Sequence, residues 1–241
     1  MRRDDQRDDD PRGGRDGTPA LGLIAAVLAL VAVPMLLTAL RDAEPKFSGG
    51  PARLLEAAQA IDRYWTTEFA RHYPGASERW RTPRVAFVDV AEGGRHAEDD
   101  YAGYYWGHSE SIHVDFDATR REGYHVLVLS HEFAHHVQKL AGLSRRLDRL
   151  QALSWPQAAE ELGMRYELQA ECISGVWARA AVRSGAYLSR IDVDRWRAMN
   201  VFSLDSSTHG SAEQRLRWFD AGYNSGDASE CDTFSPNLRA L

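Results

Sequence analysis

Apolar residues recur every three or four positions in four stretches of the chain, and this spacing predicts four helices. The first stretch ends at the sequence HYPG, whose proline and glycine interrupt a helix. Ser211 is followed three residues later by Gln214, which is the capping-box pattern that opens a helix. The predicted helices span residues 51–72, 122–141, 156–184 and 211–222.

Three short segments between the first two helices have the composition of strands: residues 84–90, the sequence YYWG and the sequence SIHVDFD. In the last of these, His113 and Asp115 alternate with apolar residues, as on a half-buried strand. We expect this strand to be the sheet edge along which an extended peptide docks. Because the strands and most of the helices are segregated along the chain, the pattern predicts an α+β domain.

The first 40 residues differ in composition from the rest. Residues 1–18 contain five arginines and six aspartates and almost nothing apolar, which predicts a disordered tail. From Gly17 to Leu40, 24 positions carry no charged residue, and a helix of roughly 20 apolar residues spans a bilayer. We therefore predict a transmembrane helix over residues 19–40, a linker over 41–50 and one domain over 51–241.

The charges beside the apolar run predict its orientation in the cell membrane. Five arginines precede the run, whereas Arg41, Lys46 and Arg53 follow it. This excess favours a cytoplasmic N-terminal tail and an extracytoplasmic domain. A cleaved signal peptide is the alternative, but the residues before Arg41 end in the bulky Leu40 rather than in a small residue.

Composition narrows the classes of partner. The net charge is −6, and no basic stripe or stacking platform of a nucleic-acid-binding protein is present in the sequence. The two cysteines, Cys172 and Cys231, are too few for a disulfide scaffold or a metal site built from cysteine. In an oxidising compartment they can pair with each other.

The sequence HEFAH places His131 and His135 four residues apart, with Glu132 between them. On a helix, residues four apart lie on one face, so both imidazoles can bind one ion. Catalytic zinc sites use three protein ligands and a water, and Glu132 is placed to take a proton from that water. The uncharged flank VLVL predicts a buried helix, in which unpaired histidines would be costly. A histidine-bearing helix without a metal is the alternative interpretation.

A third ligand must come from elsewhere in the chain. In the extended pattern H-E-x-x-H-x-x-G-x-x-H the last two positions are glycine and histidine, but here they are Gln138 and Ala141. The sequence YELQAECISGVWA offers Glu167 and Glu171 on one helical face. One of them can bind the metal while the other accepts a hydrogen bond from a ligand histidine. A solvated acidic face is the simpler alternative, although the neighbours of both glutamates are mostly apolar.

Three segments in this order, HEFAHHVQ, ELQAECISGVWA and THGSAEQRLRWFDAGYNSGDASECDTF, resemble the family of "putative neutral zinc metallopeptidases", which are bacterial membrane-anchored proteins. The resemblance covers most of the chain after residue 40 and is densest over 126–234. It implies a zincin-like fold and a Zn²⁺ site in which the glutamate that opens an E-x-x-A-[DE] pattern is the third ligand. This glutamate is Glu167, and Glu171 then supports a ligand histidine, at a position where the family usually has aspartate.

The resemblance also bears on the cysteines. The family usually has a cysteine pair near the strand that precedes the motif helix, where this chain has none. The loss of both members of one pair, while Cys172 and Cys231 remain, is what two independent disulfides permit. We therefore predict a Cys172–Cys231 disulfide, which closes a loop of about 60 residues and contributes roughly 4 kcal/mol in the chain-entropy model.

The remaining histidines are assigned from their local sequence. His209 lies just before a predicted helix, where it can stabilise an oxyanion on a substrate carbonyl or simply hydrogen-bond its own turn. We expect His72, His96, His108 and His125 to be surface or loop residues.

Together, these features predict a membrane-anchored zinc metallopeptidase that hydrolyses peptide or protein substrates. His131, His135 and Glu167 bind zinc, and Glu132 activates a zinc-bound water. One alternative is a membrane-tethered, zinc-binding interaction domain without catalysis, in which Glu132 would have no purpose. The other is a zinc hydrolase of non-peptide amides, because the same attack by water serves any amide.

Overall fold

A small mixed sheet lies against the helix that carries the HEFAH sequence. The computed structural model describes residues 50–89, 102–117, 120–202 and 208–235. The sheet consists of β1 (Arg84–Asp89), β2 (Gly103–Trp106) and β3 (Ser111–Phe116), in the order β1-β3-β2. β3 pairs in parallel with β1 and antiparallel with β2, to which a short turn connects it. The HEFAH helix contacts both β2 and β3, so the sheet forms one wall of its surroundings.

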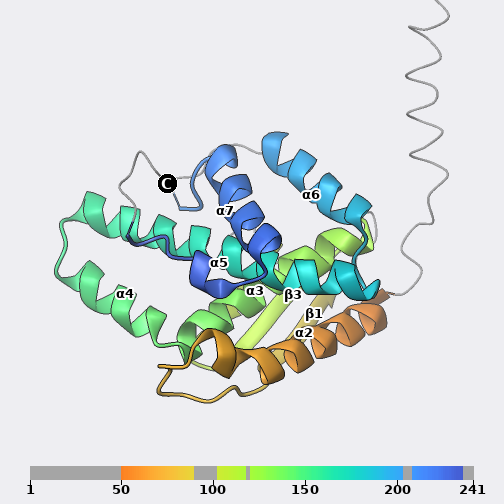
Figure 1. The fold of residues 1–241 in the computed structure, drawn as a ribbon, viewed down its shortest axis with the longest axis horizontal. Coiled ribbons are helices and arrows are strands. Elements are labelled where there is room, and N and C mark those ends of the chain that lie inside the picture. The colour runs from red at the N-terminus through yellow and green to blue at the C-terminus, as the bar shows by residue number, and fades with distance from the viewer. Residues whose placement is uncertain (1–49, 90–101, 118–119, 203–207, 236–241) are drawn as a thin grey trace, which may run out of the picture. The chain divides into compact units, whose positions relative to one another are not determined.

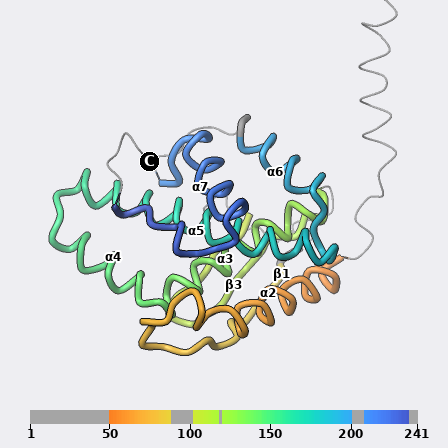
Figure 2. The backbone as a smooth tube through the Cα atoms, viewed as in Figure 1, coloured from red at the N-terminus to blue at the C-terminus, as the bar shows by residue number. Residues whose placement is uncertain are grey.

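Six α-helices account for most residues of the described part of the chain, and α2 and α3 contact the sheet (Figures 1 and 2). The HEFAH helix, α3, lies between α2 on one side and α5 on the other, and α7 covers α5 (Figure 1). α4 and α6 lie at the periphery and pack mainly on α5 and α7, respectively. The helices are α2 (Gly50–His72), α3 (Glu122–Leu140), α4 (Leu143–Ala152), α5 (Pro156–Ser184), α6 (Arg190–Phe202) and α7 (Ala212–Ser225), followed by the 3₁₀ turn η2 (Ala228–Glu230).

α3 is the central helix because apolar residues occur almost all round it. Of its 19 residues, 15 are buried, which is the pattern of a core helix rather than of an amphipathic surface helix. Leu127, Leu129 and Phe133 are among the largest fully buried side chains of the domain. The polar side chains of α3 that carry the motif are therefore held by closely packed neighbours.

α5 and α7 approach each other until their backbones touch. A Cβ atom added to Gly175 would lie 2.2 Å from the carbonyl oxygen of Phe219, and one added to Gly222 would lie 1.8 Å from that of Cys172. Atoms do not approach this closely, so only glycine permits the observed helix separation. The contact fixes α5, which carries Glu167, against the C-terminal part of the chain.

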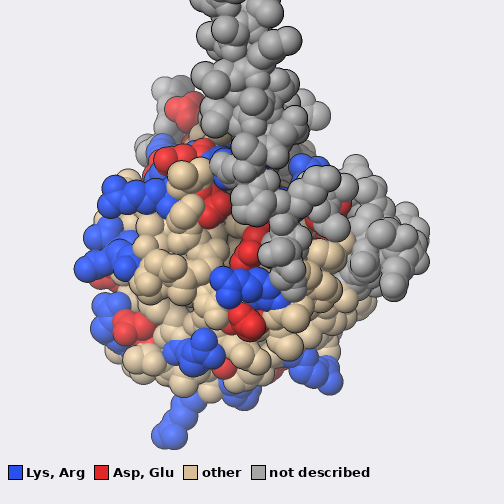
Figure 3. All heavy atoms as spheres, turned by 90° about the vertical axis from the view of Figure 1, so that its right-hand side faces the viewer, with Lys and Arg blue, Asp and Glu red and all other residues tan. Residues whose placement is uncertain are grey.

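The surface carries both signs of charge, and Lys and Arg lie among Asp and Glu on the face drawn in Figure 3. Many of these side chains form ion pairs, such as Arg53 with Glu122 and Arg197 with Asp220. Exposed pairs of this kind contribute about 0–1 kcal/mol each. The stability of the domain therefore rests mainly on its apolar core.

Most predicted elements are observed within a few residues of their predicted ends, and the prediction of an α+β domain is confirmed. The capping box of α7 is present, with Ser211 accepting from the Gln214 N–H and the Gln214 side chain accepting from the Ser211 N–H. α4 and α6 were not predicted. α4 has no buried residue, and only the spacing of its leucines at 143, 147 and 150 indicates its contact with α5.

Two expectations were wrong. β3 is the central strand of the sheet, paired on both sides, so it offers no edge to a peptide; β2 is an outer strand among the described strands. His125 is also not a surface residue: it is 1% exposed, its Nδ1 donates to the Arg121 carbonyl and its Nε2 accepts from the Asp117 N–H. The His72 side chain is buried as well. Local sequence did not reveal these contacts because their partners lie in neighbouring loops and elements.

The predicted transmembrane helix over residues 19–40, the tail before it, nearly all of the linker and His96 lie outside the described residues. Among the described helices, none combines the length and the apolar content that crossing a bilayer requires.

Gly222→Ala is expected to lower the free energy of unfolding by about 3 kcal/mol, because the added methyl group overpacks a backbone contact. The matched control is Gly163→Ala in α5, where the nearest atom to an added Cβ is the Gln151 Nε2 at 3.5 Å. That substitution should raise stability by up to about 1 kcal/mol through helix propensity. Denaturant unfolding of both variants measures the difference, and equal effects would contradict the close α5–α7 contact.

The buried His125 is expected to make stability depend on pH. Burial lowers the pKa of His125, so the folded state keeps this imidazole neutral while the unfolded state protonates near pH 6.5. The unfolded state then binds more protons, and the free energy of unfolding falls as the pH drops below about 6.5. Unfolding measured from pH 8 to 5 should show a smaller decrease for His125→Asn than for His108→Asn, which replaces an exposed histidine. Identical decreases would refute the assignment to His125.

Candidate metal site

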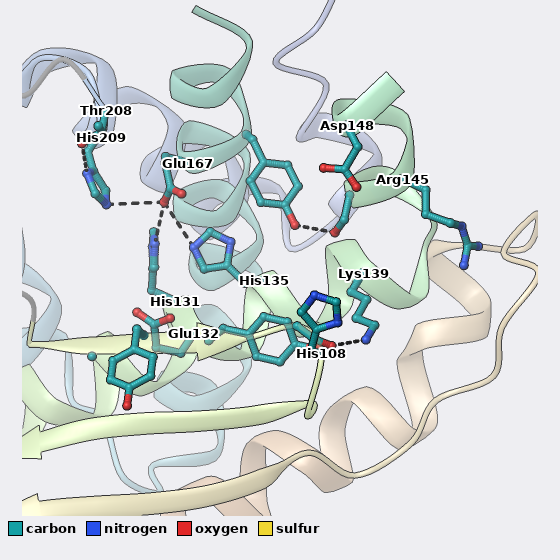
Figure 4. A pocket seen from close by; sticks show the side chains of 16 residues that line it. His108, His131, Glu132, His135, Lys139, Arg145, Asp148, Glu167, Thr208 and His209 are labelled. Atoms are coloured by element: carbon teal, nitrogen blue, oxygen red, sulfur yellow. Dashed lines mark hydrogen bonds and ion pairs between the residues drawn. The ribbon is translucent and has the colours of Figure 1, made fainter. Parts of the chain in front are cut away.

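Two histidines of α3 and one glutamate of α5 face one another across the contact between these helices (Figure 4). Nε2 of His131 lies 3.3 Å and Nε2 of His135 lies 3.2 Å from the same carboxylate oxygen, Oε2 of Glu167. The two imidazoles share a face because they are one helical turn apart, and their rings are nearly perpendicular. The three residues that the sequence predicted as ligands thus meet at one point.

The spacing of these donor atoms suits a small tetrahedral ion. One donor atom from each residue can be chosen so that all lie within 4.8 Å of one another. Donors held about 2.0–2.1 Å from a tetrahedral zinc ion lie about 3.3 Å apart, which is the separation of the glutamate oxygen from each ring nitrogen. Two imidazoles and a carboxylate also form a common ligand set of catalytic zinc.

The charges of the site are strongly coupled. Burial lowers the pKa of His131, but the hydrogen bond with Glu167 and the charges of Glu171 and Glu132 raise it to about 9. Burial would raise the pKa of Glu167, yet His135 and His131 hold it well below its usual range. Without a metal, this carboxylate therefore stays ionised between two imidazoles that tend to be protonated. A divalent cation would replace those protons as the positive charge at this point.

Glu132 lies on α3 beside this group and lines the same cleft. Its side chain is almost fully buried, and this burial raises the pKa of its carboxyl group. A carboxylate with a raised pKa is a better proton acceptor at neutral pH than an exposed one. β2 lies directly against it, since a Cβ added to Gly103 would lie 3.3 Å from Cγ of Glu132.

Glu171 lies one turn after Glu167 on α5 and faces the other nitrogen of His131. Its Oε1 is 3.6 Å from Nδ1 of His131, and that Nδ1 has no hydrogen bond within the described part of the chain. Burial raises the pKa of Glu171. The separation is longer than a hydrogen bond, so Glu171 faces this imidazole without a direct bond, and the supporting role predicted from the sequence stays a prediction.

His209 enters the site from the turn before α7. Its Nε2 is 3.5 Å from Oε2 of Glu167, and its Nδ1 lies 2.8 Å from the hydroxyl of Thr208 (Figure 4). Burial lowers the pKa of His209. The structure therefore brings this residue to the cleft, more than 70 residues along the chain from the HEFAH sequence.

The residues that hold His135 were not predicted from the sequence. Its Nδ1 lies 2.9 Å from Oε1 of Gln138, and its ring stacks on Tyr166 at 5.4 Å. A signal was present, since Gln138 follows His135 by three positions on the same helix. His136 faces away from the cleft, between the Tyr105 hydroxyl and the Arg81 carbonyl, and is a structural residue.

The site opens into a cleft of about 660 Å³, lined by residues of β2, α3, α4, α5 and the turn before α7. Tyr104 of β2 and Asp148 of α4 are among the lining residues. The basic groups at this cleft are partly neutralised, as Lys139 pairs with Glu110 and Arg145 with Glu78. The cleft gives access to the histidines between the sheet and α4 (Figure 4).

The structure contains the predicted Cys172–Cys231 disulfide, with 5.5 Å between the two Cα atoms. Cys172 directly follows Glu171 on α5, and Cys231 directly follows η2. The bond joins the helix that supplies Glu167 to the C-terminal segment. Disulfides persist in oxidising compartments, and the extracytoplasmic location predicted from the sequence stays a prediction.

Comparison with known proteins gives relatives that match about half of the chain. The uncharacterized protein YpfJ of Escherichia coli (strain K12) is 33% identical over 135 residues, which cover 51% of this chain and 46% of the relative. The uncharacterized protein Rv2575 of Mycobacterium tuberculosis (strain H37Rv) is 37% identical over 131 residues, which cover 45% of this chain and 43% of the relative. The chain thus spans less than half the length of these curated relatives. No solved structure matches it.

Residues 118–234 match the model of the family described as "Putative neutral zinc metallopeptidase". This segment contains α3, α5 and α7, and with them His131, Glu132, His135, Glu167 and His209. The resemblance stated from the sequence is thereby confirmed. Over these 117 of its 241 residues the chain is similar to the family that this description names.

Proposed function

We propose that this chain is a zinc-dependent metallopeptidase with a zincin-like catalytic domain. The observation that carries the proposal is the convergence of His131, His135 and Glu167 on one point of a cleft, with Glu132 beside them. These three residues hold the metal, and Glu132 is free to act on the substrate water. The family description of residues 118–234 supports the choice of zinc.

A bound zinc ion would lower the pKa of a coordinated water and polarise the scissile carbonyl group. Glu132 takes the proton that the water loses as it attacks the carbonyl carbon. The same carboxyl group then passes this proton to the leaving amine, which becomes the new N-terminus. Burial of Glu132 raises its pKa, and this brings its proton affinity closer to that required at neutral pH.

His209 is proposed to stabilise the negative charge that develops on the carbonyl oxygen. Burial lowers its pKa and so favours a neutral imidazole. When Nδ1 accepts a hydrogen bond from Thr208, Nε2 carries the proton and faces the cleft near Glu167. A donor fixed in this way is preorganised for an oxyanion.

The position of β2 favours a peptide substrate over a compact amide. β2 lines the cleft beside Glu132 and is paired with β3 on one side only among the described strands. An extended peptide can hydrogen-bond to the open edge of such a strand. Its carbonyl groups would then pass in front of His131 and Glu132.

The first test measures zinc content and casein cleavage for the purified full-length chain and two variants. The wild-type chain is expected to hold one zinc and to cleave. Glu132→Gln should keep the zinc and lose activity by at least about a hundredfold, because it removes the general base. Glu167→Ala should lose both, because the metal would keep only two protein ligands. Glu160→Ala, at an exposed glutamate in the first turns of α5, is the control and should leave both unchanged.

Each other outcome has a distinct meaning. A wild-type chain that holds zinc and cleaves neither casein nor other peptides would favour a non-peptide amide hydrolase or a tethered interaction domain. A wild-type chain that binds no zinc at pH 7 would refute the metallopeptidase. If Glu171→Ala loses the metal and Glu167→Ala keeps it, the assignment of the third ligand would be reversed.

Gly103→Ala tests the contact between β2 and the general base. The added methyl group would lie 3.0 Å from Cγ1 of Val128 and 3.3 Å from Cγ of Glu132, so the strand or the glutamate must shift. A displacement near 1 Å can reduce turnover by about a hundredfold. We expect kcat to fall by ten- to a hundredfold with zinc content unchanged. Gly107→Ala is the control, since the nearest atom to its Cβ is 3.8 Å away; equal kcat values for the two variants would count against the proposed contact.

A further inference from the structure

A continuous series of buried amide groups connects His135 to the disulfide. Nδ1 of His135 lies 2.9 Å from Oε1 of Gln138, and Nε2 of Gln138 donates to Oε1 of Gln169 at 3.0 Å. Nε2 of Gln169 donates in turn to the backbone carbonyl of Cys231 at 2.9 Å. Gln138 is fully buried and Gln169 is 6% exposed, so water does not compete for these hydrogen bonds.

The direction of each bond in the series follows from one fixed acceptor. Nε2 of Gln138 also lies 2.8 Å from the carbonyl oxygen of Tyr166, which can only accept a hydrogen bond. The NH₂ group of Gln138 must therefore face Tyr166, and its oxygen must face His135. It follows that Nδ1 of His135 carries a proton, so Nε2, which faces Glu167, is the ring nitrogen left to bind a metal when the imidazole is neutral. This is the tautomer that a metal ligand requires.

The far end of the series is held rigidly. Cys231 is joined to Cys172 on α5 by the disulfide. Two residues further on, the Thr233 hydroxyl donates to the Arg165 carbonyl, and the Arg165 guanidinium donates to the Thr233 carbonyl. The carbonyl group that accepts from Gln169 is thus fixed to the helix that also carries Glu167. By contrast, Nδ1 of His131 has no hydrogen bond among the described residues.

We propose that Gln138 and Gln169 are positioning residues for the metal ligand His135, and that the Cys172–Cys231 disulfide fixes the end of this series. The disulfide then does more than stabilise the fold: it sets the orientation of one imidazole about three hydrogen bonds away. The part of this inference that concerns metal affinity rests on the proposed function, whereas the part that concerns the tautomer of His135 does not.

The test compares the zinc affinity of the full-length chain with that of two variants, by competition with a chromophoric chelator. Gln169→Met conserves volume, removes the amide and touches neither His135 nor the metal. It should weaken zinc binding about tenfold, the lower end of the effect of residues that support a ligand. Ser174→Ala is the control, since Ser174 also links α5 to α3 through a buried hydrogen bond with Ser130. It should lower stability to a similar degree and leave the zinc affinity unchanged.

A second variant tests the role of the disulfide. The double substitution Cys172→Ala with Cys231→Ala should weaken zinc binding in the wild-type background and have little further effect in Gln169→Met. Residues that act through one connection show such non-additive effects. Fully additive losses would mean that the disulfide and the amide series are independent, and this would overturn the proposal.

A measurement on the metal-free chain separates this inference from the proposed function. At a pH where His135 is neutral, the ¹⁵N spectrum of its ring should show a single Nδ1–H tautomer in the wild-type chain and a mixture in Gln138→Met. If the wild-type chain shows this tautomer but binds no zinc, the proposed function fails and the positioning role stands. If it binds zinc and Gln138→Met binds as tightly with the same tautomer, the positioning role fails and the proposed function stands.

Discussion

The site depends on one shared contact, in which a single carboxylate oxygen of Glu167 faces the ring nitrogens of both His131 and His135. The contact requires that α3 and α5 keep a fixed register, because a shift of one helix by a fraction of a turn would separate the carboxylate from one imidazole. Several features of the fold serve this register. Gln138 of α3 donates to the Tyr166 carbonyl of α5, and the glycines at 175 and 222 let α7 press directly on the outer side of α5.

This arrangement places several ionisable groups in a low-dielectric environment, which is unfavourable unless each group has a partner. Burial raises the pKa of both Glu132 and Glu171, while the pKa of Glu167 is lowered by the imidazoles beside it. The three carboxyl groups are identical in chemistry, and their surroundings separate them. The two imidazoles keep Glu167 ionised and suited to bind a cation, whereas Glu132 gains proton affinity and is suited to exchange a proton. Burial, which is unfavourable for ionised groups, thus gives the three carboxyl groups different chemical roles.

Structural features that depend on the local spacing of residues were predicted from the sequence, whereas features that depend on pairing between distant segments were not. The boundaries of α5 were predicted correctly because its apolar periodicity extends over many residues. Glu167 was identified because it lies four residues before Glu171, in the E-x-x-A-[DE] pattern of the family that the sequence resembles. The position of β3 was wrong because alternation of apolar residues looks the same in a central and an outer strand. Its parallel pairing with β1, which made it central, joins segments more than twenty residues apart. The role of Gln138 was missed because a glutamine on a buried helix identifies its partners only once Tyr166 and Gln169 are placed beside it.

The three histidines of the sequence HEFAHH give α3 two functions, because two of them face the site and the third contacts the sheet. His131 and His135 lie on the same face of α3, whereas His136 is turned by about 100° from His135 and points to a different side. There it joins the Tyr105 hydroxyl of β2 to the Arg81 carbonyl that precedes β1. His136 therefore fixes the sheet to the outer face of the helix whose inner face carries the ligands. Because β2 also touches Glu132 through Gly103, this connection links the position of the strand to the position of the general base. His136 thus contributes to the geometry of the site through its contact with the sheet, although it does not face the other two histidines.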